Sequence, residues 1–177
     1  MAKIQSAIDK FKNLSTIEST MENGNGVKLS RKDIEALCSM YPVDQIFVQD
    51  AVLYIRERTI KVRCSVPKGA PYATRPAPYV TKEQQIRCVS QSGYALVGGL
   101  LEERDHVIDP RLFRGRIESS TGLFYRREDL KYKNNIPADE PFSFVLSLDE
   151  IAQKGPFLVG NFTLDGPTKG TLQFIAK

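Results

Sequence analysis

The 177-residue sequence lacks several features that define common protein classes. It contains no apolar run of about 18 residues, so no transmembrane helix is expected. Its first residues, Met-Ala-Lys-Ile-Gln-Ser, lack the apolar stretch of a signal peptide, and a cytoplasmic protein is therefore expected. Cys38, Cys64 and Cys88 form no C-x-x-C motif, so the sequence indicates buried thiols rather than a zinc site or a disulfide framework.

The common catalytic signatures are also missing. There is no G-x-S-x-G, no P-loop and no G-x-G-x-x-G after a strand. The single histidine, His106, lies in the charged stretch Glu102-Glu-Arg-Asp-His and is expected in a solvated loop. No histidines or carboxylates have metal-ligand spacing, so neither a metal nor another cofactor is predicted. The net charge of +4 is too mild to predict nucleic-acid binding, but it suits an acidic partner such as coenzyme A or a carrier protein.

The sequence predicts an accessory segment at the start of the chain, followed by a compact domain. Residues 1–29 are expected to form a short amphipathic helix and a flexible linker, and residues 30–177 the main domain. Ser30 and Asp33 have the spacing of a capping box, which predicts a helix that continues to Tyr41 and stops at Pro42. Alternating residues then predict strands at Gln45–Arg56 and Thr59–Val66, joined as a hairpin.

A long buried helix, about Thr81–Leu101, dominates the middle of the sequence. Its second half is apolar on nearly every face, and such a helix must be buried. The glycines Gly93, Gly98 and Gly99 indicate close approach to a strand or to a ligand. Further strands are predicted at about Leu112–Arg126, Phe142–Ala152, Pro156–Leu164 and Gly170–Ile175. Without repeated strand–helix alternation, the expected class is α+β, with an antiparallel sheet of about six strands wrapped around the helix.

Candidate chemistry concentrates near the proline-rich loop Pro67–Pro78 and the long helix. The residues concerned are Tyr41, Tyr72, Tyr79, Thr81, Arg87, Ser90 and Gln91. Free N–H groups at the start of the helix are expected to donate hydrogen bonds to a carbonyl oxygen or a developing oxyanion. Four of these residues have a plainer alternative: Tyr41 as a core aromatic, Thr81 as a cap, Ser90 bonded to the carbonyl one turn back, and Gln91 as a structural hydrogen bond to the adjacent loop. The basic residues between Arg111 and Lys133 indicate either a solvated strand face or a patch for phosphate or a carrier protein.

The order and spacing of these residues resemble the FcoT-type hotdog thioesterases over roughly residues 30–177. The resemblance rests on Tyr41 after the first helix, the hairpin, Gly69-Ala-Pro-Tyr72, the helix positions Cys88, Gln91 and Tyr94, and the tail Asn161–Gly166 with Gly170–Phe174. It implies a hotdog fold, a homodimer or higher homo-oligomer, and a tunnel for a fatty-acyl chain and its pantetheine arm. It also implies the catalytic positions Tyr41, Tyr72, Thr81 and Ser90. The residues expected to bind substrate are Tyr79, Arg87, Gln91, Gly93 and Tyr94.

The positions at which this sequence differs from the family determine which reaction is expected. Thr81 and Ser90 stand where the family has asparagines, and Arg87 stands where hotdog dehydratases have an acid. Some relatives of this family hydrolyse long-chain acyl thioesters, whereas others add glycine to a (2E)-enoyl thioester on a carrier protein. Water needs a strong base and none is evident, whereas a neutral amine is already a nucleophile. Conjugate addition is therefore expected, with thioester hydrolysis or non-catalytic acyl binding as the alternatives.

Overall fold

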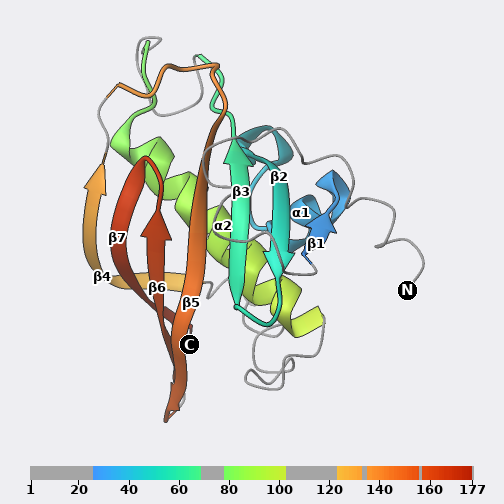
Figure 1. Ribbon diagram of the computed structural model, residues 1–177, viewed down its shortest axis with the longest axis vertical. Helices are drawn as coiled ribbons and strands as arrows, with labels where there is room; N and C mark the ends of the chain where they lie inside the picture. Colours follow the sequence, from blue (N-terminus) through green and yellow to red (C-terminus); the bar gives the residue numbers. More distant parts are fainter. Residues whose placement is uncertain (1–25, 69–77, 103–122, 133–134, 156, 177) are drawn as a thin grey trace.

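The computed structural model describes residues 26–68, 78–102, 123–132, 135–155 and 157–176. These residues form an α+β structure, in which two α-helices accompany one antiparallel sheet of seven strands (Figure 1). In chain order the elements are β1 (Val27–Leu29), α1 (Arg31–Leu37), the 3₁₀-helix η3 (Val43–Gln45), β2 (Val48–Tyr54), β3 (Thr59–Cys64), α2 (Lys82–Glu102), β4 (Leu123–Tyr132), β5 (Phe142–Lys154), β6 (Phe157–Asp165) and β7 (Thr168–Ala176). The strands are ordered β1-β2-β3-β5-β6-β7-β4 across the sheet.

Helix α1 begins as predicted but ends early. The Ser30 hydroxyl accepts from the Asp33 amide and the Asp33 carboxylate accepts from the Ser30 amide, which confirms the capping box. The helix ends at Leu37 rather than at Tyr41, and the Tyr41 amide bonds to the Cys38 carbonyl in a turn. Pro42 excludes Tyr41 from the helix, because its ring disfavours helical backbone at the residue before it. Tyr41 therefore lies beyond α1, in the connection to η3.

The predicted hairpin is confirmed, and the sheet extends one strand beyond it. Strands β2 and β3 pair antiparallel, joined by a turn at residues 55–58 in which Arg58 has a φ of 47°. Val27–Leu29 pair with Ala51–Leu53 of β2, so the sheet begins before residue 30, the predicted start of the domain. Three residues are too few to show an alternating pattern, and this strand was therefore not predicted.

The later strands agree with the sequence except at β4. Strands β5, β6 and β7 overlap their predicted ranges closely. Strand β4 spans Leu123–Tyr132, whereas the predicted strand covered Leu112–Arg126, and residues 112–122 lie outside the described part of the chain. Within that part, β4 pairs only with β7, at the edge of the sheet. Charged residues such as those at 126–129 are common on edge strands, and they conceal the strand pattern.

Helix α2 lies against one face of the sheet and is the centre of the core. It contacts β2, β3, β4, β5 and α1, and every residue from Cys88 to Leu100 is buried, as its apolar pattern predicts. A Cβ added at Gly98 would lie 2.5 Å from a Leu37 methyl group, and one at Gly99 would lie 2.8 Å from a Leu53 methyl group. Gly99 therefore allows the predicted close approach to a strand, β2, whereas Gly98 approaches the helix α1.

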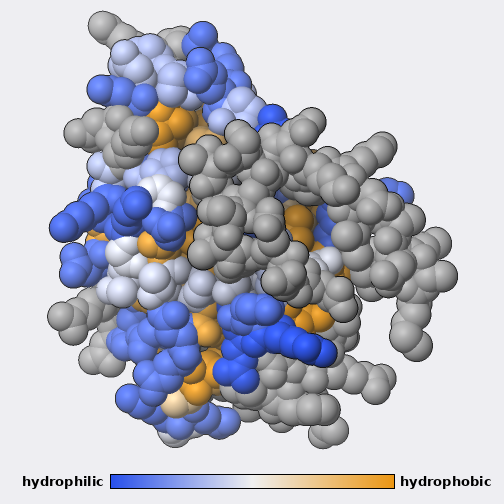
Figure 2. Space-filling view, in the orientation of Figure 1, coloured by the Kyte–Doolittle hydropathy of each residue, from blue (hydrophilic) through white to orange (hydrophobic). Residues whose placement is uncertain are grey.

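On the face shown in Figure 2, the hydrophobic residues show as separate patches between polar ones. The large apolar side chains that are exposed are Met40, Val43, Tyr79 and Phe157, of which the first two flank Tyr41 in sequence. Neither α1 nor α2 is long and apolar enough to cross a membrane.

Candidate active site

A pair of hydroxyl groups joins the turn after α1 to the middle of α2. The Tyr41 hydroxyl lies 2.9 Å from the Ser90 Oγ, and either group can be the donor. Ser90 is 8% exposed and Tyr41 is half-buried, so the pair lies at the margin of the core. The Tyr94 ring meets the Tyr41 ring edge to face, with centroids 6.3 Å apart. Tyr41, Ser90 and Tyr94, three of the residues expected at the site, are thus brought together.

Arg87 adds a positive charge to this group. Its Cζ lies 5.5 Å from the centre of the Tyr41 ring, within the range of a cation–π contact. Its Nη1 donates to the Gln45 Oε1 at 2.6 Å. The guanidinium is therefore held in place beside Tyr41, one helical turn before Ser90.

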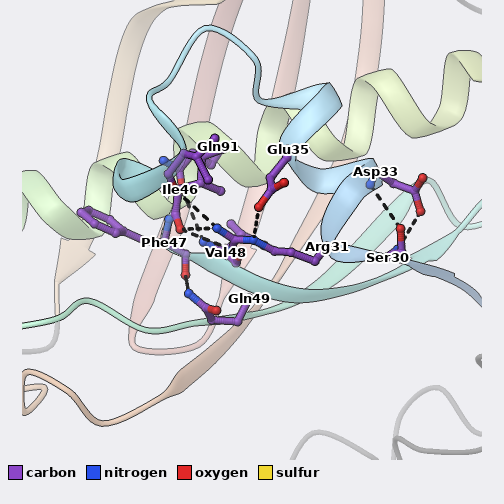
Figure 3. A network of polar contacts seen from close by, with 10 residues as sticks. Ser30, Arg31, Asp33, Glu35, Ile46, Phe47, Val48, Gln49 and Gln91 are labelled. Carbon is purple, nitrogen blue, oxygen red and sulfur yellow. Dashed lines mark hydrogen bonds and ion pairs between the residues drawn. The ribbon is translucent and has the colours of Figure 1, made fainter.

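Gln91 supports the site from within the core. Its side chain is fully buried, its Oε1 accepts from the Phe47 amide at 2.8 Å and its Nε2 donates to the Gln45 carbonyl at 2.7 Å. Figure 3 shows Arg31 bonded to the same segment, where its guanidinium donates to the Val48 carbonyl at 2.7 Å. The segment from Gln45 to Val48 is therefore fixed by both helices, and the structural interpretation of Gln91 is confirmed. Its predicted contact with substrate stays a prediction.

Replacing Gln91 by leucine should lower the free energy of unfolding by about 3 kcal/mol, because the Phe47 amide and the Gln45 carbonyl would lose their buried partner. Chemical denaturation of the purified variant measures the change. Gln153→Leu is the matched control, since the Gln153 side chain makes an exposed bond to the Gly155 carbonyl. It should change stability by no more than about 0.5 kcal/mol. Equal losses in the two variants would contradict a supporting role for Gln91.

Thr81 caps α2 and lies far from the hydroxyl pair. Its Oγ1 accepts from the Gln84 amide at 3.3 Å, and the Gln84 Oε1 accepts from the Thr81 amide at 2.8 Å. Nine residues separate Thr81 from Ser90, which is about 13.5 Å along a helix at a rise of 1.5 Å per residue. The structure therefore does not bring Thr81 together with Tyr41 and Ser90.

The cap also occupies a donor that was expected to bind an oxyanion. The Gln84 amide donates to the Thr81 hydroxyl, so the expectation of free N–H groups at the start of the helix is wrong for this amide. Hydrogen bonding within the first turn lowers the pKa of Glu83. Just before the helix, Tyr79 is 48% exposed and pairs through its backbone with Pro137.

The remaining predicted site residues are Gly93 and Tyr72. Gly93 is buried within α2, in the turn between Ser90 and Tyr94. Tyr72 lies outside the described residues, as does His106. Their predicted roles stay predictions.

The three cysteines are buried, as the sequence predicts. The Cys38 thiol donates to the Gln91 carbonyl at 3.5 Å, and burial raises its pKa to about 12 despite the opposing charge of Arg31. Burial also raises the pKa of Cys64 well above its usual value, reinforced by a hydrogen bond with the Cys88 thiol and by the nearby Cys38. Protonated thiols are poor nucleophiles, so neither Cys38 nor Cys64 suits covalent catalysis.

Gln45 is a site residue that the sequence did not indicate. Its side chain accepts from Arg87 and its carbonyl accepts from Gln91, so one residue links two neighbouring turns of α2. The sequence assigned it to the start of a strand, where a polar residue carries no signal of a long-range contact.

The arrangement favours chemistry in which negative charge develops and a proton moves. Two hydroxyls in contact can pass a proton, and the adjacent guanidinium favours anions. Within the described ranges, no three His, Cys, Asp or Glu side chains are placed to hold a metal ion. Comparison of the chain with protein-family models and with curated proteins finds no match.

Proposed function

We propose that this protein is a hotdog-fold enzyme that adds glycine or a similar amine to a (2E)-enoyl thioester carried by coenzyme A or an acyl carrier protein. The observation that carries the proposal is the Tyr41–Ser90 hydroxyl pair beside the Arg87 guanidinium. The fold supports it, because one long buried helix packed on an antiparallel sheet is the layout of a hotdog domain. The strands before and after α2, β3 and β4, are separated by β5, β6 and β7, which is also compatible with that fold.

The proposed reaction balances without a cofactor. The lone pair of the neutral amine forms the C–N bond at the β-carbon, and the electrons of the C=C bond move toward the thioester oxygen to give an enolate. The ammonium that results loses one proton and the α-carbon gains one. Tyr41 carries this proton, and Ser90 orients the Tyr41 hydroxyl.

Addition suits these groups better than hydrolysis does. Attack by water requires a base that removes a proton as the bond forms, whereas an amine reacts without one. The described groups at the Tyr41–Ser90 pair include hydroxyls, an aromatic ring and a guanidinium. A guanidinium stays protonated and cannot serve as that base. In this proposal, Tyr72 remains a second candidate proton carrier.

Incubation of the full chain with a (2E)-enoyl carrier-protein thioester and glycine tests the proposal. Intact mass spectrometry should show the mass of glycine added to the thioester, with the thioester bond retained. Release of free acid without an adduct would indicate a thioesterase. Retention of an unchanged acyl chain would indicate a binding protein. Either result would replace conjugate addition as the function.

A further inference from the structure

Tyr79 is an aromatic residue held at the surface by a fixed backbone. Backbone groups of residues 136–138 bond to the Pro78 carbonyl at 2.9 Å and to the Val80 amide at 2.8 Å. Tyr79 lies between these two bonds and pairs through its own backbone with Pro137. Its side chain is nonetheless 48% exposed. An aromatic ring that is exposed on a fixed backbone is suited to stack against a flat partner.

One face of α2 leads from the Tyr41–Ser90 pair toward Tyr79. Ser90, Ile86 and Lys82 are spaced four residues apart, so they lie on one face of the helix. Exposure increases along this face toward the start of the helix, because Ser90 is buried, Ile86 is half-buried and Lys82 is exposed. Tyr79 precedes Lys82 by three residues, so the exposed ring lies at the open end of this face.

We infer that Tyr79 stacks against the adenine of coenzyme A, so that the enoyl thioester arrives as an acyl-coenzyme A rather than on a carrier protein. The inference rests on the proposed addition reaction and names the carrier of its acyl substrate. Tyr79 is thereby assigned as a nucleotide-binding residue, away from the atoms that react. A carrier protein joins its pantetheine arm to a serine and offers no base that could stack on this ring.

The length of the pantetheine arm fits the distance along the helix. Eight residues separate Lys82 from Ser90, which is about 12 Å at a rise of 1.5 Å per residue. About 13 bonds join the sulfur of coenzyme A to its first phosphorus, and at about 3.5 Å for three bonds of extended chain they span about 15 Å. A thioester at the Tyr41–Ser90 pair therefore places the phosphates near the start of α2, with the adenine beyond them.

The charges at the start of α2 make stacking the main source of recognition. Lys82 provides a positive charge for the phosphates, and its ammonium lies 4.9 Å from the centre of the Tyr132 ring, a neutral partner. Glu83 follows in sequence and carries the opposite charge, so the attraction from Lys82 is partly offset. Stacking on Tyr79 does not depend on charge, because every base has a π-face.

Thioesters with and without the nucleotide test the inference. With glycine as the amine, kcat/KM for an enoyl-coenzyme A should exceed that for the matching enoyl-pantetheine about tenfold, because only the first carries adenine. Tyr79→Ala should lower this ratio to about one, whereas Tyr79→Phe keeps the ring and should retain the ratio. Phe157→Ala is the control, since Phe157 is an exposed aromatic residue at the start of β6, and it should leave the ratio unchanged.

A binding measurement that needs no turnover separates this inference from the proposed reaction. The chain contains no tryptophan, so Tyr79→Trp introduces a single indole at the stacking position. Free coenzyme A should quench the indole fluorescence of this variant in a saturable manner, and pantetheine should not. In Phe157→Trp, the matched control, neither compound should quench. A melting curve for each variant confirms that the chain is folded.

The outcomes distinguish the nucleotide site from the reaction. If coenzyme A does not quench and both thioesters react equally, the nucleotide site is overturned while the reaction stands. If coenzyme A quenches but no thioester gains glycine, the reaction is overturned while the nucleotide site stands. Faster conversion of a carrier-protein thioester than of enoyl-coenzyme A, with both rates unaffected by Tyr79→Ala, would also overturn the inference and assign the carrier protein as the substrate.

Discussion

Replacement of Tyr41 by phenylalanine should lower the turnover of the enoyl thioester about a hundredfold or more. Positioned proton carriers contribute about 10²–10⁴-fold to enzymatic rates, and the substitution removes the hydroxyl and keeps the ring. The ring should hold its place, because its contacts with Tyr94 and Arg87 do not need the hydroxyl. The lost bond to Ser90 should cost only about 1 kcal/mol of stability. Steady-state rates and a denaturation curve for the same preparation measure both effects.

Tyr54→Phe provides the control for Tyr41→Phe. Tyr54 ends strand β2, and its pKa is raised by burial and by the charge of Glu57, so it is also a tyrosine in a perturbed setting. It should keep full turnover, because it lies at the other end of β2 from the segment that Gln91 binds. Full activity in Tyr41→Phe would show that Tyr41 does not carry the proton.

Replacement of Gly170 by alanine should lower the free energy of unfolding by about 4 kcal/mol. Gly170 has a φ of 134°, where side chains are strained by about 1–3 kcal/mol, and it lies in β7 opposite Leu130 of β4. An added Cβ would overlap the Asp129 carbonyl oxygen and lie 3.0 Å from the carbonyl carbon. Backbone atoms cannot rotate away, so overpacking adds a further cost of about 1–3 kcal/mol. Denaturant titration measures the loss.

The variant Gly155→Ala measures the cost of backbone strain alone, without the steric overlap expected in Gly170→Ala. Gly155 also has a positive φ, of 59°, but an added Cβ would meet no atom within 4 Å. Its cost should therefore be only the left-handed penalty of about 1–2 kcal/mol. A similar loss of stability in both variants would show that the close contact between β7 and β4 adds no cost to a side chain at Gly170.

The elements that could be predicted from the sequence are those with a long or chemically distinct signal. Helix α2 was located within one or two residues because its apolar stretch is long, and the start of α1 because Ser30 and Asp33 form a capping box. Strand β1 was missed because it is three residues long, and the end of β4 was placed too early, at Arg126, because that strand is charged. In both cases the partner strand, and not the local pattern, determines the structure.

The residues of the candidate site could be predicted from the sequence, but the contacts between them could not. Tyr41, Arg87 and Ser90 were all named, but the bond between Tyr41 and Ser90 spans 49 residues of sequence. No local spacing indicates a contact of that kind. The separation of Thr81 from Ser90, in contrast, follows from helical rise alone. Gln45 was missed because its role depends on two turns of a helix that folds against it.

The three buried thiols have a consequence for measuring motion in this protein. Cys38, Cys64 and Cys88 come from the end of α1, from β3 and from α2, so their burial depends on these three elements staying together. An alkylating reagent needs an exposed thiolate. Exposure of all three thiols, and ionisation of Cys38 and Cys64, require the core to open first. The rate of labelling is therefore a measure of how often the core opens, and the native cysteines serve as the labelling sites. The same chemistry that makes these cysteines inert in the folded protein makes them reporters of its transient openings.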